Sequence, residues 1–396
     1  MNYKNALIYT ENFRFERGSF SVKDGKFCDV MGEAKDDALD LDGAKVIPGL
    51  IDIHTHGNSG SDFSDGDYDG YVRMARYYAS RGVTSFAATT LTVPYEQIEA
   101  ACACAKKLHT QRPSGAATLR GVHMEGPFFC TAKRGAQNAA HLKAPDFDAF
   151  CRINEVSGGL VKLIAMAPEL DGAEKFIEKA SRICTVSLGH TEADYDTARR
   201  AFDAGARELT HLYNAMPGLH HRDPGPIDAG FEDNRVSAEL IGDGEHVHPA
   251  IIRLAFRMFG AERTVLISDS LRCCGMPDGE YELGGQRTFL QNGVARLADG
   301  TLAGSATDLF ECMCRVISFG VPECDAIRAS TYNPARQIGC LNEVGSIADG
   351  KCADFVICDD GLNARQVFVA GKPAGDHNVM LEEVVINEGR GPVEMR

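Results

Sequence analysis

The sequence predicts an α/β protein in which a (β/α)8 barrel is joined to a small β domain built from both ends of the chain. Short apolar runs alternate with longer helical patterns through the middle of the chain, which is typical of a parallel sheet. Seven or eight such units within about 300 residues favour a closed barrel over an open sheet. β-rich runs divided by Gly and Asp occupy the first 48 and the last 50 residues, so we expect one small domain from the two ends.

The two chain ends have the residue types and turn signals of strands. Asp-Gly dipeptides at 24–25 and 42–43 separate strand-like runs near the N-terminus. We therefore expect a small β domain from 1–48 plus 344–396, and a barrel from 49–343. The strand-like runs are 6–10, 19–30 and 37–49 at one end and 344–360, 364–375 and 383–387 at the other.

In the middle of the chain, strand-like runs are followed by helical patterns. The apolar run 83–91 precedes the helical pattern 95–108, and the run 161–169 precedes the pattern 172–180. This order is that of βαβ units, whose strands pair in parallel. The further strand-like runs are 117–126, 185–191, 208–214, 235–244 and 264–270.

Charge and composition exclude several classes of protein. The 41 Lys and Arg against 56 Asp and Glu give a formal net charge of −15, which argues against a nucleic-acid or anionic-membrane surface. An apolar content of 44% excludes disorder as a global state. No stretch approaches the roughly 20 apolar residues of a membrane span, and MNYKNALIYTENFRFE lacks a signal-peptide pattern. With 14 scattered cysteines and no Cys-x-x-Cys pair, we expect a cytoplasmic protein with free thiols.

Two histidines one residue apart are the first candidate site residues. His54 and His56 lie in PGLIDIHTHGNSG, after an apolar run. Residues i and i+2 of a strand point the same way, so both imidazoles can face one centre. A lone His-x-His also fits polar residues at a strand end, so this pair does not establish a metal site by itself.

Further polar side chains follow directly after other apolar runs. The carboxyl ends of barrel strands converge on one face, where active sites lie. One isolated residue of this kind would be explained as a strand cap, but four histidines and two carboxylates at five strand ends favour a shared centre. The residues that join His54 and His56 are Glu125, His190, His211 and Asp269.

This set of residue types indicates a metal-dependent hydrolase. Imidazoles and carboxylates without a thiolate suit Zn²⁺ or Fe²⁺. Such a metal lowers the pKa of bound water to about 7 and polarises a carbonyl. A carboxylate beside that water can take its proton and return it to a leaving group, and Asp269 is our candidate. The predicted reaction is hydrolysis of an amide or a similar C–N bond.

Segments spread over nearly the whole chain resemble the amidohydrolase superfamily and, within it, the N-acetylglucosamine-6-phosphate deacetylase family. HLYNAMPG, HMEGPF and DGEHVHP separate this family from dihydroorotase-like and deaminase relatives. The resemblance implies a metal-bearing (β/α)8 barrel with a small β-sandwich built from both chain ends. It also implies removal of the acetyl group from N-acetyl-D-glucosamine 6-phosphate in amino-sugar metabolism. The matching segments are PGLIDIHTHG, GVTSFAATTLT, GVHMEGPF, SLGHT, HLYNAMPG, IGDGEHVHP, SDS, GMPDGEYELGG, GTLAGSATDL, YNPARQIG and GSIADGKCADFVICD.

The resemblance assigns roles to the residues at the strand ends. Asp269 matches the catalytic acid and base of the family. One or two metals per subunit, zinc or iron, are implied. The implied ligands are Glu125, His190 and His211 for the metal that activates water, and His54, His56 and a bridging Glu125 for a second one.

The resemblance also implies substrate contacts. A phosphate dianion approaching a protein of charge −15 needs local donors, and His246 matches a phosphate-contacting histidine. Arg222 matches an arginine that reaches the neighbouring subunit's site, which implies a homodimer; by itself it would be interpreted as a solvated loop residue. Asn214 and Ala215 match ligand contacts. A loop that covers the substrate is matched by Leu302, Ala303, Gly304 and Ser305, where Gly304 would allow close backbone approach.

The chain departs from the family pattern at two places. Gln137 stands where the family often has a histidine near the sugar, and because Gln donates and accepts hydrogen bonds, we still expect it to bind substrate. Arg272, Cys273 and Cys274 stand where small residues are common, and we interpret the cysteines as small loop residues. His123 is interpreted as structural or as a support for the ligands.

Other functions remain open. N-acetylgalactosamine 6-phosphate differs in the orientation of one hydroxyl, and the sequence does not separate the two substrates. Another substrate, such as a cyclic amide, is disfavoured by HLYNAMPG and Arg222. A catalytically inactive scaffold on the same fold is disfavoured because all six candidate positions are filled.

Overall fold

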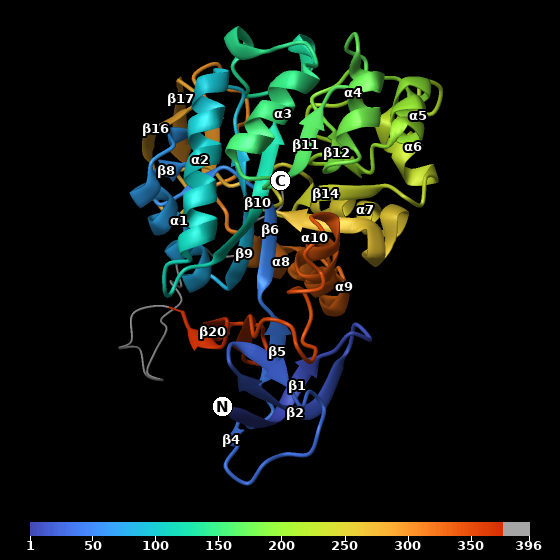
Figure 1. Cartoon of the computed structure of the whole chain (residues 1–396). Coiled ribbons are helices and arrows are strands. Elements are labelled where there is room, and N and C mark those ends of the chain that lie inside the picture. Colours follow the sequence, from blue (N-terminus) through green and yellow to red (C-terminus); the bar gives the residue numbers. More distant parts are fainter. Residues whose placement is uncertain (375–396) are drawn as a thin grey trace.

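Eight parallel strands form a nearly closed barrel in the computed structural model, which describes residues 1–374 (Figure 1). Each strand pairs with the next one along the chain, and this confirms the parallel barrel that the sequence predicts. The predicted strand at 383–387 and His377 lie outside the described residues. The barrel strands are β6 (Leu50–Thr55), β9 (Val83–Thr90), β10 (Thr118–Glu125), β11 (Val161–Met166), β12 (Thr185–Leu188), β13 (Glu208–Leu209), β14 (Ser237–Ile241) and β15 (Thr264–Ile267).

The first and last barrel strands are joined at their carboxyl ends by backbone hydrogen bonds. The N–H of Asp269 donates to the carbonyl of His54 at 2.9 Å, and the N–H of His56 donates to the carbonyl of Ser270 at 2.8 Å. The hydroxyl of Ser268 donates to the buried carboxylate of Asp52 on β6 at 2.5 Å. The barrel is therefore closed at the end where the candidate site residues lie.

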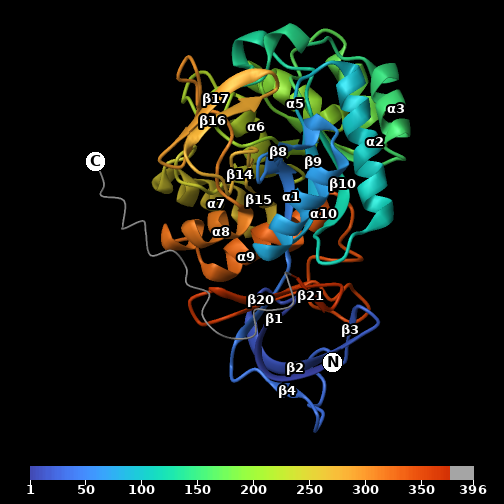
Figure 2. The ribbon, with the colours of Figure 1, turned by 90° about the vertical axis from the view of Figure 1, so that its left-hand side faces the viewer.

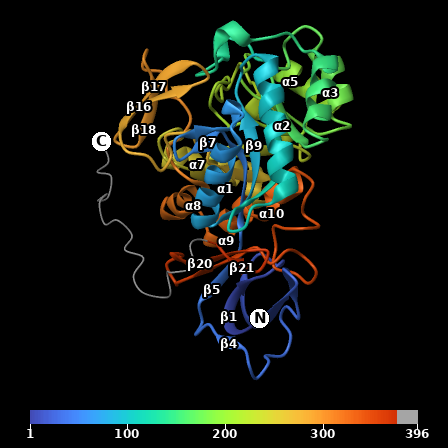
Figure 3. The ribbon, with the colours of Figure 1, turned by 60° about the vertical axis from the view of Figure 1, so that its left-hand side comes forward.

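Helices surround the barrel, as Figures 1 and 3 show. Several begin at an Asp whose side chain accepts backbone N–H groups of the first turn, among them Asp67, Asp146, Asp194 and Asp308. Such caps stabilise helix starts and leave the apolar face to pack on the strands. The α-helices of the described chain are α1 (Tyr68–Ser80), α2 (Tyr95–Gln111), α3 (Phe147–Val156), α4 (Ala173–Ala180), α5 (Tyr195–Ala204), α6 (Pro226–Glu232), α7 (Pro249–Arg263), α8 (Leu309–Ser318), α9 (Glu323–Ser330) and α10 (Tyr332–Gln337).

After β15 the chain forms a three-stranded antiparallel sheet before it continues into α8. Its strands are β16 (Gly279–Leu283), β17 (Gln286–Gln291) and β18 (Val294–Leu297). Isolated bridges from Leu302 to Arg296 and from Ser305 to Ser270 then bring the predicted substrate loop beside the end of β15. The sequence analysis did not predict this sheet.

The two chain ends form a second sheet below the barrel (Figure 2). Its strand order is β21-β20-β19-β5-β1-β2-β3, with β4 paired to β1, so the first and last segments of the described chain lie side by side. Aromatic side chains of Tyr3, Phe20, Phe355 and Phe368 pack on one another in its core. The strands are β1 (Asn2–Tyr9), β2 (Phe15–Lys23), β3 (Lys26–Cys28), β4 (Leu39–Asp40), β5 (Lys45–Pro48), β19 (Phe355–Cys358), β20 (Ala364–Val369) and β21 (Lys372–Pro373).

This sheet agrees with a small β domain built from both ends, while its boundaries after residues 48 and 343 stay a prediction. A short hairpin, β7 (Gly57–Asn58) with β8 (Ser61–Asp62), follows β6 at the barrel mouth. None of the helices within residues 1–374 is both long enough and apolar enough to cross a membrane.

Candidate metal centre and active site

Three side chains from three different strands meet at the carboxyl end of the barrel. Glu125 ends β10, while His190 and His211 lie just beyond β12 and β13. The Glu125 Oε1 atom lies 3.1 Å from Nε2 of His190 and 3.1 Å from Nε2 of His211, and the two Nε2 atoms are 3.0 Å apart. Ligand atoms bound at about 2.0–2.1 Å to a tetrahedral metal lie roughly 3.4 Å apart. The three atoms are therefore close to the spacing that one metal ion requires.

The hydrogen bonding of His190 leaves a lone pair facing this group. Its Nδ1 atom lies 2.9 Å from the carbonyl oxygen of Lys133, which can only accept, so Nδ1 holds the proton. When the ring is neutral, as a metal ligand must be, its Nε2 atom presents a lone pair to the Glu125 carboxylate and to His211. Acceptors that face one another without a donor are stabilised by a cation between them. The donor set fits a divalent metal such as zinc or iron.

A second group of possible ligands shares Glu125. His56 Nε2 lies 3.2 Å from Oδ1 of Asp269 and 3.3 Å from Oε2 of Glu125. His54 Nε2 lies 3.6 Å from Asp269 Oδ1 and 3.4 Å from Glu125 Oε1. These contacts are longer than those of the first group, and they place Glu125 between the two groups. The geometry thus fits one metal or two, and the roles of these residues stay predictions.

Three of the predicted residues have strained backbones. The φ angles of His190, His211 and Asp269 are 50°, 30° and 48°, in the left-handed region that residues with a Cβ seldom adopt. Such conformations cost about 1–3 kcal/mol each and occur most often at functional sites, where surrounding contacts hold them. All three residues come directly after a barrel strand, so the strain turns their side chains toward the common centre.

Asp269 is placed to act as a base. Burial disfavours ionisation of its carboxyl group, but the charge of His54 and the hydrogen bond from His56 outweigh burial and lower the pKa of Asp269. The backbone of Gly304 lies against it, because a Cβ at that position would come within 2.5 Å of the Asp269 carbonyl oxygen. The expected close approach at Gly304 is therefore an approach to Asp269 itself.

Gln137 contacts a predicted metal ligand. Its amide nitrogen donates to Oε2 of Glu125, and its amide oxygen accepts the N–H of Thr92 at 2.8 Å. The side chain is buried and is held at both ends. Its predicted contact with the sugar stays a prediction, and the structure adds that it orients Glu125.

His246 lies between two acceptors. Its Nδ1 atom is 2.6 Å from the carboxylate of Asp243, and its Nε2 atom is 2.7 Å from the carbonyl oxygen of Ala303. Both partners only accept, so both ring nitrogens hold a proton. Burial opposes the charged ring, but Asp243 outweighs it and raises the pKa of His246. A buried positive charge thus contacts the loop of Leu302 to Ser305 that was predicted to cover the substrate.

The other predicted substrate residues lie in the segment after β13. Asn214 donates from its side chain to the carbonyls of His211 and Leu212 at 3.2 and 3.3 Å, and the carbonyl of Ala215 accepts the N–H of Thr191 at 3.1 Å. The Asn214 bonds hold the turn after His211, and the bond between Thr191 and Ala215 joins this turn to the one that carries His190. Arg222 is exposed on the following loop, where it donates to His221 at 2.8 Å. Its predicted role across a subunit interface is not tested by a single chain.

Three carboxylates that were not predicted from the sequence are buried inside the barrel. Asp52, Glu208 and Glu239 have no exposed surface. A signal was present, because each is a charged residue within or beside an apolar strand run, and such residues are rarely buried unless they are paired. Glu239 is the most informative of them, since it contacts both His54 and His211.

Cys273 and Cys274, which were interpreted as small loop residues, are buried thiols. Burial raises the pKa of the Cys273 thiol to about 11, and burial raises the pKa of Cys274 well above its ordinary value. Neither belongs to a group of possible metal ligands within the described residues. Arg272 forms an ion pair with Asp65 at 2.7 Å. These observations agree with the interpretation of both cysteines as small loop residues.

Comparisons with known proteins agree with this geometry. A family model described as the amidohydrolase family matches residues 45–381. The N-acetylglucosamine-6-phosphate deacetylase of Vibrio furnissii is 37% identical over 343 residues, which are 86% of each chain. The N-acetylgalactosamine-6-phosphate deacetylase of Escherichia coli O157:H7 is 37% identical over 337 residues, 84% of this chain and 88% of the relative. A solved variant of N-acetyl-D-glucosamine-6-phosphate deacetylase from Mycobacterium smegmatis, in complex with N-acetyl-D-glucosamine-6-phosphate, superposes with a TM-score of 0.88 at 32% identity, over 94% of this chain and 99% of that one.

Proposed function

This chain belongs to the amidohydrolase family, and on that premise we propose that it hydrolyses the acetamide of N-acetyl-D-glucosamine 6-phosphate to D-glucosamine 6-phosphate and acetate. The main structural support is the convergence of Glu125, His190 and His211 on one point beside Asp269. The substrate follows from the names of the relatives that align over most of the chain.

The chain's own residues supply the proton transfers. When bound by the ligand groups, a divalent metal, zinc or iron, would supply Lewis-acid activation of water and of the acetamide carbonyl. The ionised carboxylate of Asp269 accepts the proton of the attacking water. It then donates that proton to the amine as the C–N bond breaks. Nε2 of His56 and of His54 lie 3.2 and 3.6 Å from Oδ1 of Asp269, so the residue that carries the proton stands beside the ligand groups.

The phosphate is assigned to the loops around the barrel mouth. His246 is assigned to the phosphate because it matches the family's phosphate-contacting histidine and its ring lies 2.7 Å from the carbonyl oxygen of Ala303, in the loop that was predicted to cover the substrate. Gln137, Asn214, Ala215 and the loop from Leu302 to Ser305 complete the set of substrate contacts. Free thiols among the described residues support a cytoplasmic location.

A homodimer completes the proposal, with Arg222 of each subunit reaching the partner's site. Its exposed position on a loop with few other contacts supports this assignment. Mixing Asp269→Asn protein with Arg222→Ala protein tests it. Hybrid dimers contain one site with both wild-type residues, so activity should rise above the sum of the two inactive homodimers. No gain after confirmed subunit exchange would refute the shared site.

The reaction is tested by acetate release from purified protein loaded with Zn²⁺ or Fe²⁺. We expect rapid release from N-acetyl-D-glucosamine 6-phosphate and very little from N-acetyl-D-glucosamine, because the phosphate contacts are lost. Equal rates on both sugars would refute the phosphate site. A protein that cannot be loaded with metal and releases no acetate would instead favour an inactive scaffold.

The galactosamine epimer is the second candidate substrate. The E. coli relative named for N-acetylgalactosamine 6-phosphate is as similar to this chain as the V. furnissii relative, at 37% identity each. The two sugars differ at one hydroxyl, and a site that hydrogen-bonds that hydroxyl discriminates strongly against the epimer. The ratio of kcat/KM for the two substrates decides between them.

A further inference from the structure

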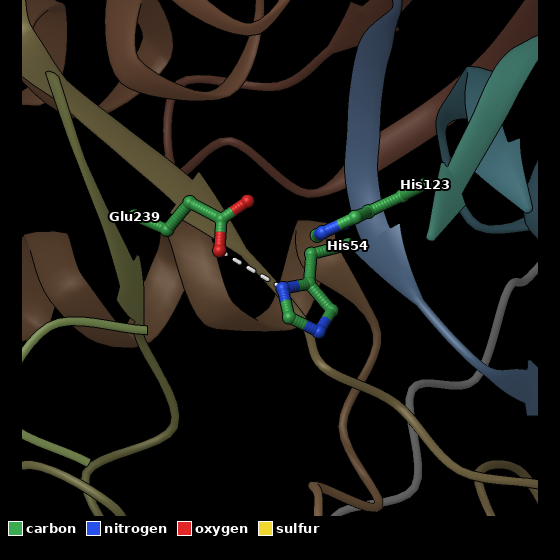
Figure 4. A group of neighbouring side chains, drawn as sticks. All are labelled: His54, His123 and Glu239. Atoms are coloured by element: carbon green, nitrogen blue, oxygen red, sulfur yellow. Dashed lines mark hydrogen bonds and ion pairs between the residues drawn. The ribbon is translucent and has the colours of Figure 1, made fainter. Parts of the chain in front are cut away.

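Glu239 is a buried carboxylate at the middle of β14, beneath the candidate metal centre. Its Oε2 atom lies 2.9 Å from Nδ1 of His54 (Figure 4). The same oxygen accepts the backbone N–H of His211 at 3.2 Å. Its own backbone carbonyl accepts the N–H of Leu212 at 2.8 Å. One residue therefore contacts a member of each ligand group, although it lies in the middle of its strand and not at the carboxyl end, where the predicted ligands lie.

The contact with His54 determines which ring nitrogen faces the centre. A carboxylate that lies 2.9 Å from Nδ1 holds the proton on that nitrogen. In the neutral ring, which is the form that binds a metal, the lone pair of His54 is then on Nε2, which points toward Glu125 and Asp269 at 3.4 and 3.6 Å. Without the carboxylate, the proton could reside on either nitrogen, and the tautomer protonated at Nε2 would turn an N–H toward a cation.

The contacts with His211 and Leu212 hold a strained turn. His211 has a φ of 30°, which must be stabilised by neighbouring contacts. The side chain of Glu239 accepts the N–H of His211, and its backbone accepts the next N–H. Both bonds fix the direction in which the imidazole of His211 leaves the strand.

Glu239 is less suited to bind a metal of its own. Its ligand atom, with one nitrogen each of His54 and His123, lies in a group whose members are within 4.8 Å of one another. A metal there would have to displace the last proton of His54, whose other nitrogen already faces Glu125 and Asp269. His123 meanwhile faces the carbonyl of Ile53 with its Nδ1 at 3.2 Å. The group is better explained as a support for the centre above it.

We propose that Glu239 is a positioning residue that couples the two halves of the metal centre, by fixing the tautomer of His54 and the backbone turn of His211. The proposal rests on the proposed function, because it takes His54 and His211 to be metal ligands. It adds that the affinity for metal at both positions depends on a residue that touches neither metal. Partners of this kind typically change metal affinity by about 10–100-fold when they are mutated.

Two substitutions of Glu239 separate its hydrogen bonds from its charge. In Glu239→Gln the amide oxygen can take the place of Oε2 and accept both hydrogen bonds, while the amide nitrogen replaces Oε1, which has no partner. In Glu239→Ala both bonds are lost. We expect metal affinity, measured by competition with a chromophoric chelator, to fall about 10–100-fold in Glu239→Ala and less in Glu239→Gln.

Glu208→Gln is the matched control. Glu208 lies on the neighbouring strand β13, has no exposed surface and forms no hydrogen bond with a predicted ligand. Burial and the charge of Glu239 hold the pKa of Glu208 well above its ordinary value, so the neutral amide resembles its native state. We expect wild-type metal affinity. An equal loss in Glu208→Gln would overturn the proposal, because the effect would then be one of buried polarity in general.

The tautomer of His54 is measured independently of metal and activity. In ¹⁵N spectra of metal-free protein, recorded at a pH high enough for the His54 ring to be neutral and assigned by comparison with His54→Asn, the ring should be protonated at Nδ1 in the wild type and mixed in Glu239→Ala. If the wild type binds no metal but shows this tautomer, the proposed function fails and the positioning contact stands. If it binds metal and Glu239→Ala binds it equally well with the same tautomer, the positioning role fails. A third equivalent of metal that disappears only in Glu239→Gln and in His123→Ala would make Glu239 a ligand and overturn the proposal.

Discussion

The two ends of strand β10 place buried charges in opposite kinds of surroundings. Near its start, Arg120 donates to Ser85 at 3.1 Å and to Glu343 at 2.7 Å, and it lies 3.6 Å from Asp354. At its end, Glu125 lies among imidazole nitrogens and the carboxylate of Asp269. Both side chains are almost fully buried.

The difference is the balance of donors and acceptors. Arg120 is a donor surrounded by acceptors, so its charge is balanced within the chain, although Oδ2 of Asp354 forms no hydrogen bond. Around Glu125 acceptors outnumber donors: the Nε2 atoms of His190 and His211 lie 3.0 Å from each other and 3.1 Å from the same carboxylate oxygen, and Nε2 of His54 has no hydrogen-bond partner. Because an unsatisfied buried polar group is costly, the second arrangement indicates a cation that the chain itself does not supply. Burial alone would not distinguish the two ends.

Glu125→Gln should produce the largest effect. The amide keeps the shape but places a donor among the imidazoles and removes the negative charge shared by both ligand groups. We expect loss of bound metal and a fall in acetate release of about 10³-fold or more, since metal activation is worth several kcal/mol. Elemental analysis and steady-state kinetics measure this. Retention of one tightly bound metal with full activity would contradict the assignment of Glu125 to the centre.

Asp269→Asn should have the next largest effect, on the reaction rather than on the first metal. General acid and base catalysis is worth about 10²–10⁴-fold. We expect kcat to fall by that factor while the group of Glu125, His190 and His211 still binds metal. A variant that lost metal and activity together would show that Asp269 acts mainly as a ligand. Metal content and kcat are measured on the same preparation.

Arg120→Met tests the start of strand β10, where a buried donor is paired with acceptors of the chain. Removing one partner of a buried ion pair typically costs about 3–5 kcal/mol, so the urea midpoint should fall while acetate release per folded molecule is kept. Burial raises the pKa of Asp354 above 3.8, and loss of Arg120 should raise it further. A raised pKa in the folded state gives stability at low pH that is lost as pH rises. The destabilisation should therefore be smaller at pH 5 than at pH 8, and the opposite trend would contradict the pairing.

The barrel could be predicted because its signal is repeated, whereas single features were missed. Apolar runs such as 83–91 and 161–169 each indicate a buried parallel strand, and their alternation with helices determines the topology. The three-stranded sheet after β15 occurs only once and has no such repetition. Its signals were the two-residue turns Gly284-Gly285 and Asn292-Gly293, in which all four residues have positive φ.

In the candidate site, too, the repeated feature could be predicted and the individual supporting contacts could not. His54, His190, His211 and Asp269 follow apolar runs, so strand-end position and residue type indicated their convergence. The support by Glu239 could not be predicted, because which buried carboxylate contacts which ligand depends on strand stagger within the barrel. The orientation of Glu125 by Gln137 likewise depends on how the loop after β10 folds back.

Gln137→Ala removes one of the few donors near Glu125 and therefore tests the excess of acceptors at that end of β10. A hydrogen bond to a charged group is worth about 1.5–3 kcal/mol, so we expect metal affinity and kcat to fall about 10–100-fold. If Gln137 contacts only the sugar, KM should rise while metal affinity stays unchanged. Gln137→His restores a donor and should recover part of the loss in the first case.

His246→Gln should give the smallest effect, because His246 resembles Arg120 in being a donor with both acceptors present. The amide keeps one donor group but loses the positive charge. Charged hydrogen bonds exceed neutral ones by about 1 kcal/mol, so KM for the phosphorylated sugar should rise about fivefold, with little change for the free sugar. In the wild type the raised pKa keeps the ring charged above pH 6.5, so KM should increase only at higher pH. A KM that is independent of pH, and unchanged in the variant, would leave His246 as a support of the Ala303 loop alone.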